Sequence, residues 1–185
     1  MPLADTTIAG FAELARGYCA WCEGATLGPD AESQAAGWVA RLYAAALRLP
    51  PRDCCYAEDA PELPQAQLDR AKGNLAPFMG GYYRECFDPD PELDDPPCMG
   101  DLGDDLLDIY TDLKHGLLVF DAGDVHDALW HWSFLHRIHW GRHAVGALFA
   151  LHCLHLSKDR RQVRVLADAG DAAGTVARSH PRGQS

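Results

Sequence analysis

The chain has 185 residues, of which 48% are hydrophobic and 23% are charged, and its formal net charge is −11. This length predicts one globular domain, and the acidic excess argues against binding to nucleic acid or to an anionic membrane surface. No uninterrupted apolar run reaches the roughly 18 residues that a transmembrane helix needs.

Two features indicate a cytoplasmic protein with reduced thiols. No secretory signal follows Met1, and seven cysteines are an odd number for a disulfide framework. Cys19 and Cys22 form a Cys-x-x-Cys pair inside a predicted helix, near its C-terminal end. That position does not favour zinc binding or redox chemistry, so we expect buried, inert thiols.

The apolar residues follow the helical period almost throughout, and no segment alternates as a half-buried strand does. The predicted helices in the first half of the chain cover residues 6–23, 29–49 and 64–87, with a loop at 52–63 that contains Cys54-Cys55. Pro77 and Gly80-Gly81 are expected to break or kink the third region, and the prolines and acids of 88–100 indicate an extended surface loop.

Two further helices are predicted to be antiparallel neighbours, because very few residues join them. Asp101 caps the first, which ends near Ala122, and the second begins at Asp124 or Val125. This fifth helix is apolar almost all round and is predicted to run to about Leu156 as the central helix.

The predicted fold class is all-α. It is a single-domain bundle of about five helices over residues 1–156, with a long central C-terminal helix. Residues 157–185 are basic and contain few apolar anchors, so they are predicted to form a mostly disordered tail.

An acidic stripe lies on the predicted fourth helix, opposite its apolar arc. The stretch from Glu85 to Asp127 has fourteen acidic residues and one cation, Lys114. The aspartates of the stripe are Asp101, Asp104, Asp105, Asp108 and Asp112. Like charges at i, i+4 cost about 0.2–0.5 kcal/mol per pair, so the helix dipole, a metal, a basic partner or a neighbouring helix should offset them. The other interpretation is a solvated face.

Three histidines of the predicted fifth helix are spaced i, i+3 and i+7, and Trp132 and Trp140 flank them. With a carboxylate from a facing helix they could bind zinc or iron. The candidate metal ligands are His136, His139, His143, Asp108 and Asp112. The alternative is that these histidines are core residues with hydrogen-bond partners, because no Glu-x-x-His or His-Glu-x-x-His motif accompanies them. No cofactor is assigned on this pattern.

Segments 82–95, 101–116 and 127–152 resemble the uncharacterised bacterial family called domain of unknown function 5063. The most specific runs are Asp-Ile-Tyr-x-Asp-Leu at 108–113 and His-Trp-Gly-x-His at 139–143. The signature residues are Tyr110, Trp132, Trp140 and Gly141. The resemblance implies an all-α domain and no particular activity. It also leads us to expect Asp105, Asp108 or Asp112 within hydrogen-bonding reach of a fifth-helix histidine or tryptophan N–H.

Two functional hypotheses follow from these patterns. The first is a binding or adaptor module whose outward face, formed by Asp101, Asp104, Asp105 and Asp108, meets a basic protein partner. The second is a metal-dependent hydrolase or oxidoreductase with its site between the fourth and fifth helices. A further interpretation is that the basic tail folds back over the acidic stripe. Enzymatic activity and oligomeric state stay open.

Overall fold

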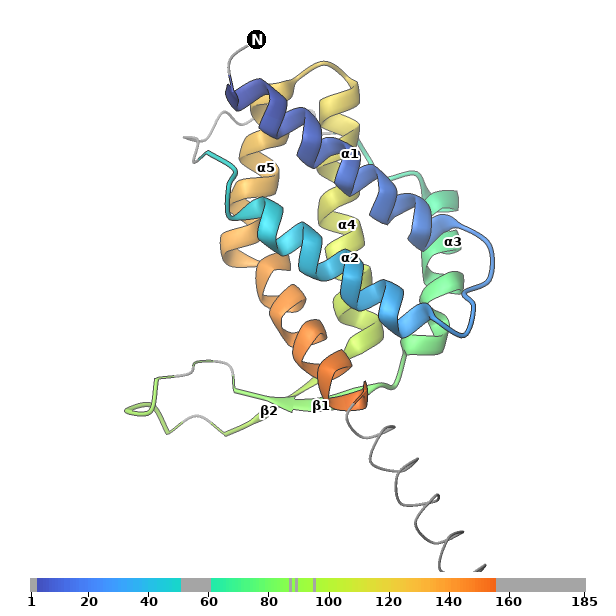
Figure 1. Ribbon diagram of the computed structural model, residues 1–185, viewed down its shortest axis with the longest axis vertical. Helices are drawn as coiled ribbons and strands as arrows, with labels where there is room; N and C mark the ends of the chain where they lie inside the picture. The colour runs from blue at the N-terminus through green and yellow to red at the C-terminus, as the bar shows by residue number, and fades with distance from the viewer. Residues whose placement is uncertain (1–2, 51–60, 87, 89, 95, 156–185) are drawn as a thin grey trace, which may run out of the picture. The chain divides into compact units, whose positions relative to one another are not determined.

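A computed structural model of the chain describes residues 3–50, 61–86, 88, 90–94 and 96–155 (Figure 1). Residues 1–150 form one compact unit and residues 151–185 a second, of which 151–155 are helical. The predicted tail and Cys54-Cys55 lie outside the described residues. The proposed domain boundary after residue 156 therefore stays a prediction.

The first unit is helical over most of its length, which confirms the all-α fold class. Its helices are α1 (Leu3–Glu23), α2 (Ala31–Ala46), α3 (Gln65–Leu75), the 3-10 turn η1 (Ala76–Phe78), α4 (Leu102–Asp121) and α5 (Val125–Ile138). A further helical segment covers residues 140–150. None of the helices in the described part of the chain has the length and hydropathy required to cross a membrane.

Two short strands correct the strand-free prediction. β1 (Tyr82–Glu85) pairs with β2 (Cys98–Asp101) in an antiparallel ladder, with Tyr82 opposite Asp101 and Glu85 opposite Cys98. The region predicted as helical over 64–87 is helical only to Phe78, and the break expected at Pro77 and Gly80-Gly81 is confirmed: α3 ends at Leu75 and η1 at Phe78. Strands of four residues are too short for their alternation to be distinguished from a helical pattern.

The predicted long C-terminal helix is interrupted. α5 ends at Ile138, His139 has φ −141° and ψ −91°, and helical structure resumes at Trp140. A Cβ on Gly141 would lie 2.0 Å from the backbone oxygen of His136, so the tight path after the break requires glycine there. The prediction of one continuous helix to about Leu156 is therefore wrong, because the helix is interrupted at His139.

The core lies where α1 and α5 pack against α4. Figure 1 shows α4 and α5 side by side, with α1 and α2 crossing in front of them. The largest fully buried side chains include Phe11, Tyr18, Leu42, Leu75, Leu106, Ile109, Leu113, Leu129, Trp132 and Trp140. Each such side chain contributes about 1.5–3 kcal/mol of transfer free energy, so this face holds the fold together.

Trp132 fixes the register of α5 against α4. Its Nε1 donates a hydrogen bond to the backbone oxygen of Leu113 at 3.2 Å. A Cβ on Gly116 would lie 2.0 Å from the same Nε1, so only glycine lets the indole approach so closely. The Nε1 atom of Trp140 in turn donates to the Trp132 oxygen at 3.1 Å, which holds the helical segment after the break against α5.

Candidate metal centre

The N-terminus of α4 is fixed by Asp101, which caps it as predicted. One carboxylate oxygen accepts a hydrogen bond from the Gly103 N–H at 2.9 Å, and the other accepts from the Gly80 N–H at 2.9 Å. The side chain therefore satisfies one of the free N–H groups of the first turn and ties the helix to the turn before β1. Asp101 therefore has a structural role as the cap of α4, and its place on an interaction face stays a prediction.

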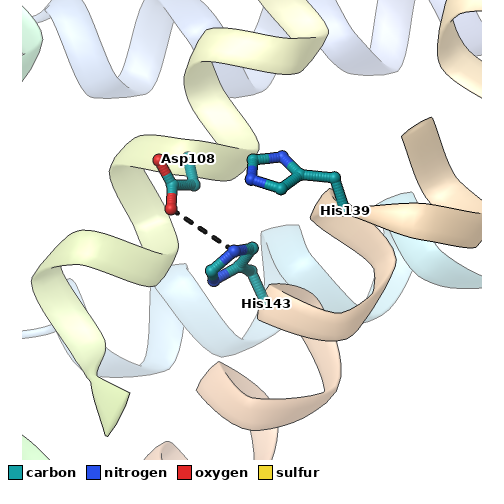
Figure 2. Close-up of side chains that lie close together, drawn as sticks. All are labelled: Asp108, His139 and His143. Atoms are coloured by element: carbon teal, nitrogen blue, oxygen red, sulfur yellow. Dashed lines mark ion pairs between the residues drawn. The ribbon is translucent and has the colours of Figure 1, made fainter.

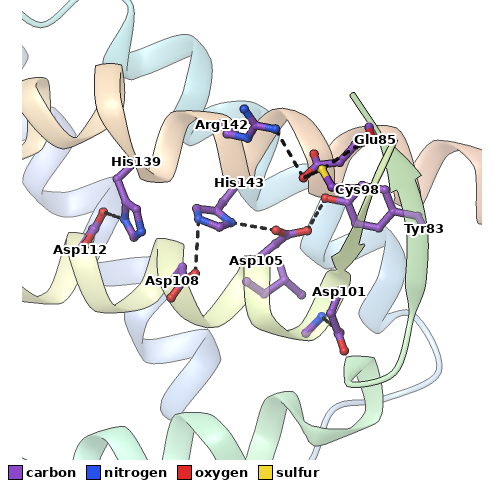
Figure 3. Close-up of polar contacts among 12 residues, drawn as sticks. Tyr83, Glu85, Cys98, Asp101, Asp105, Asp108, Asp112, His139, Arg142 and His143 are labelled. Carbon is purple, nitrogen blue, oxygen red and sulfur yellow. Dashed lines mark hydrogen bonds and ion pairs between the residues drawn. The ribbon is translucent and has the colours of Figure 1, made fainter. Parts of the chain in front are cut away.

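Three aspartates of α4 lie toward the histidines that follow α5 (Figure 3). The Asp112 Oδ2 atom lies 2.7 Å from Nδ1 of His139, and the Asp105 Oδ1 atom lies 2.8 Å from Nδ1 of His143. Asp108 Oδ2 is 3.3 Å from the other ring nitrogen of His143, Nε2. The expected contact between the acidic stripe and the histidines is confirmed.

The aspartates of the acidic stripe differ in burial, so the interpretation of the stripe as a fully solvated face is wrong. Asp105 and Asp112 are only 5% and 8% exposed, whereas Asp104 is exposed. A buried carboxylate needs partners that donate hydrogen bonds, and the two histidines supply them. The predicted interaction face thus loses Asp105, and Asp101 is occupied as a cap. A basic protein partner stays a prediction.

Tyr83 extends the network to the strands. Its hydroxyl donates to Asp105 Oδ2 at 2.7 Å, so this carboxylate has a partner on each oxygen. Tyr83 is not among the residues predicted from the sequence, because a tyrosine in a short strand carries no signal for a site on a helix. Burial and the hydrogen bond to Asp105 raise the pKa of Tyr83, so it stays a neutral donor.

The electrostatics of the cluster favour a charged His143. Its pKa is raised, mainly by the hydrogen bond to Asp105 and further by Asp108, against the opposing effect of burial. The pKa of Asp108 is raised chiefly by burial, while His143 acts against that rise. A metal cation bound between Asp108 and His143 would therefore displace the proton that His143 holds.

Asp108, His139 and His143 form a group that can hold a metal ion, because one ligand atom from each lies within 4.8 Å of the others (Figure 2). The side chains of Asp108 and His143 are 34% and 26% exposed, and that of His139 is 45% exposed. The 3.3 Å approach of His143 Nε2 to Asp108 is close to the spacing of two ligands around tetrahedral zinc, about 3.3 Å for bonds of about 2.0 Å.

The sequence runs at 108–113 and 139–143, which meet at this group, both lie within a match to a known family. A family model described as Domain of unknown function (DUF5063) matches residues 3–157. The chain belongs to this family. The match includes α4, the break at His139 and the whole Asp/His cluster, but the DUF5063 description names no activity.

The fold recurs in a solved protein. The crystal structure of protein BF1032 from Bacteroides fragilis is similar to this DUF5063 domain, with a TM-score of 0.63 and 23% sequence identity. The similarity covers 80% of this chain and 94% of that one, and at this identity it shows the fold alone. No curated protein matches the chain.

The structure separates His136 from the other histidines of the predicted trio. Its ring packs against Trp140 and Tyr43, with centroids 4.7 and 4.9 Å away, and it does not belong to the metal-competent group. The break at His139 changes the helical phase, so i, i+3 and i+7 no longer share one face. Burial lowers the pKa of His136.

The remaining signature residues are structural. Trp132, Trp140 and Tyr110 are buried, and the Tyr110 hydroxyl donates to Glu23 at 3.0 Å. Glu23 also pairs with Lys114 at 2.7 Å, so Tyr110 anchors the C-terminal end of α1 to α4. Gly141 permits the break. None of these four residues belongs to the group of Asp108, His139 and His143 that can hold a metal ion.

Proposed function

We propose that this DUF5063 domain binds a divalent transition-metal ion, Zn²⁺ or Fe²⁺, through Asp108, His139 and His143. The observation that carries the proposal is the pair of hydrogen bonds that Asp112 and Asp105 make to the Nδ1 atoms of the two histidines. Histidine ligands in metal centres donate their second ring N–H to a carboxylate in this way. The Nε2 atoms are then the nitrogens available to the ion.

The donor set favours these ions over Mg²⁺ and Ca²⁺. Two imidazoles and one carboxylate suit zinc and iron, whereas the alkaline-earth ions prefer oxygen ligands alone. The charge balance also supports a cation. Asp105, Asp108 and Asp112 bring three carboxylates to one face of α4, and a divalent ion would offset their repulsion in place of the proton that His143 otherwise holds.

Three protein ligands leave coordination positions for water or a substrate. Since His139 is the most exposed of the three side chains, solvent reaches the centre from its side. A bound ion would supply Lewis-acid activation of water, and bound iron would supply oxygen chemistry. The protein residues orient the ligands: Asp112 holds His139, and Asp105 holds His143.

The test is metal content and affinity in untagged, full-length protein. We expect about one equivalent of zinc or iron by mass spectrometry, and saturable Zn²⁺ binding by calorimetry after chelation. Asp108→Asn, His139→Gln and His143→Gln should each weaken binding at least about tenfold, because each removes one ligand.

His126→Gln is the matched control, because His126 is an exposed histidine near the start of α5. Its affinity for Zn²⁺ should equal that of the wild type. Wild-type protein that binds no stoichiometric metal after incubation with either ion would refute the proposal. Equal affinities in the ligand variants and the control would refute it as well.

A further inference from the structure

The structure contains a cavity of about 1110 Å³ that is not lined by Asp108, His139 or His143. Its walls come from Tyr43 of α2, the β1 strand, the last turns of α5 and the 140–150 segment. Ligand pockets in proteins are usually about 300–1,000 Å³, so this one is large enough for a small organic molecule.

One part of the wall is apolar and faces solvent. Val145 and Phe149 line the cavity and are 51% and 56% exposed, which is unusual for large apolar side chains one helical turn apart. Tyr43 adds an aromatic ring from α2. Covering such a surface with an apolar or aromatic group lowers the free energy, because apolar area is removed from water.

The charged side chains that line the cavity are mostly positive, whereas the chain as a whole is negative. Arg84, Arg137 and Arg142 line it together with one acid, Glu85, although the formal net charge of the protein is −11. Arg142 lies 3.6 Å from Glu85 and so neutralises it. Arg84 and Arg137 have no ion pair with any residue in the described part of the chain, and two guanidinium groups are left to attract an anion.

His136 does not contribute to this positive charge. It lines the cavity, but burial lowers its pKa, and its Nε2 atom is buried with no hydrogen-bond partner among the described residues. The ring is therefore neutral near pH 7. The attraction for anions rests on arginines, whose charge does not change between pH 6 and 8.

We propose that this cavity binds a small aromatic carboxylate, with its ring on Val145, Phe149 and Tyr43 and its carboxylate on Arg84 and Arg137. The apolar wall alone would accept neutral molecules, and the two arginines select the anion. Carboxylates form two parallel hydrogen bonds with guanidinium groups, which gives this class an advantage over neutral amides of the same shape. The proposal does not depend on the metal centre.

The test uses a matched pair of probes, 2-naphthoate and the neutral 2-naphthamide, with the full chain in calorimetry. We expect saturable binding of 2-naphthoate and about tenfold weaker binding of 2-naphthamide, which cannot form the charge-assisted bonds. Inorganic phosphate should not compete, because it has no apolar body. The affinity for 2-naphthoate should be equal at pH 7 and pH 8.

Two variants and a control complete the test. Arg84→Gln with Arg137→Gln should weaken 2-naphthoate about tenfold or more and leave 2-naphthamide unchanged. Val145→Trp should obstruct the apolar wall and weaken binding of both probes in protein whose circular dichroism is native. Arg48→Gln, outside the cavity, should behave as wild type. Absence of saturable 2-naphthoate binding, equal affinities for the two probes, or full affinity in the double variant would overturn the proposal.

Discussion

The Nδ1 atom of His139 lies 2.7 Å from Oδ2 of Asp112, at the residue where α5 has ended and the next helical segment has not begun. A continuous helix would carry His136, His139 and His143 along one face. The break instead directs His136 toward Tyr43 and brings His139 and His143 to α4. The interruption of the helix is therefore what assembles the candidate centre.

The hydrogen bond from Tyr83 to Asp105 should contribute measurably to stability, because the accepting carboxylate is buried. Tyr83→Phe removes this donor, and we expect it to lower the free energy of unfolding by about 1–3 kcal/mol in urea titrations. Tyr82→Phe is the matched control. The neighbouring tyrosine is 69% exposed, and its substitution should change stability by less than about 0.5 kcal/mol. Equal effects of the two variants would contradict the role given to Tyr83.

The bounds of α4 and the start of α5 could be predicted because local signals agree there. Asp101 and Asp124 are both helix caps in the structure, and the apolar arc of α4 points to the core. The meeting of the aspartates with the histidines was expected only through the resemblance to a family. The periodicity alone placed the acidic stripe in solvent, since carboxylates opposite an apolar arc are normally exposed.

Other parts of the site depend on tertiary contacts that leave no trace in periodicity. The break at His139 lies inside an unbroken helical pattern, and Gly141 is the one residue near it that hints at an interruption. β1 is held by its partner strand and by the Tyr83 ring, which crosses Gly100 so closely that a Cβ there would lie 2.4 Å from its Cζ. Such close approaches can be recognised only in three dimensions.

The contact between Gly116 and Trp132 should make α4 intolerant of a single methyl group. A Cβ at Gly116 would lie 2.0 Å from Trp132 Nε1, so Gly116→Ala must displace the indole and weaken its bond to Leu113. We expect a loss of about 1–3 kcal/mol in the free energy of unfolding and a changed near-ultraviolet circular dichroism spectrum.

Gly73→Ala provides the control for the same chemical change. Gly73 lies in α3 with no atom within 4 Å of an added Cβ, so alanine there should stabilise the protein by up to about 1 kcal/mol. The two substitutions are thus expected to have opposite signs. A neutral or stabilising Gly116→Ala would show that the indole does not fix the helix register.

The buried thiols of α1 should be inert in the folded protein. Burial raises the pKa of Cys19 to about 12 and raises that of Cys22 well above its ordinary value, so neither forms the reactive thiolate at neutral pH. Cys86 is exposed. Brief alkylation followed by peptide mapping should modify Cys86 in native protein, and Cys19 and Cys22 only in denaturant. Native-state labelling of Cys19 at the rate of Cys86 would contradict this expectation.

The contribution of His143 to stability should fall as the pH rises. The Asp105 hydrogen bond raises the pKa of His143 in the folded state, so folding favours its protonated form. This contribution is fully present below the pKa of the unfolded chain, about 6.5, and is lost as the pH rises through the higher folded value. In the presence of a metal chelator, the wild type should be more stable than His143→Gln at about pH 5.5. This difference in the free energy of unfolding should shrink as the pH rises to about 8.

The comparison with His143→Gln isolates this group from its neighbours. Burial lowers the pKa values of His131 and His136, so their contributions are lost as the pH falls, but both residues are present in the two proteins and cancel in the difference. Metal binding should follow the opposite trend, because an ion at His143 competes with the proton and gains affinity as the pH rises. A stability difference that grows with pH would show that His143 folds in its neutral form.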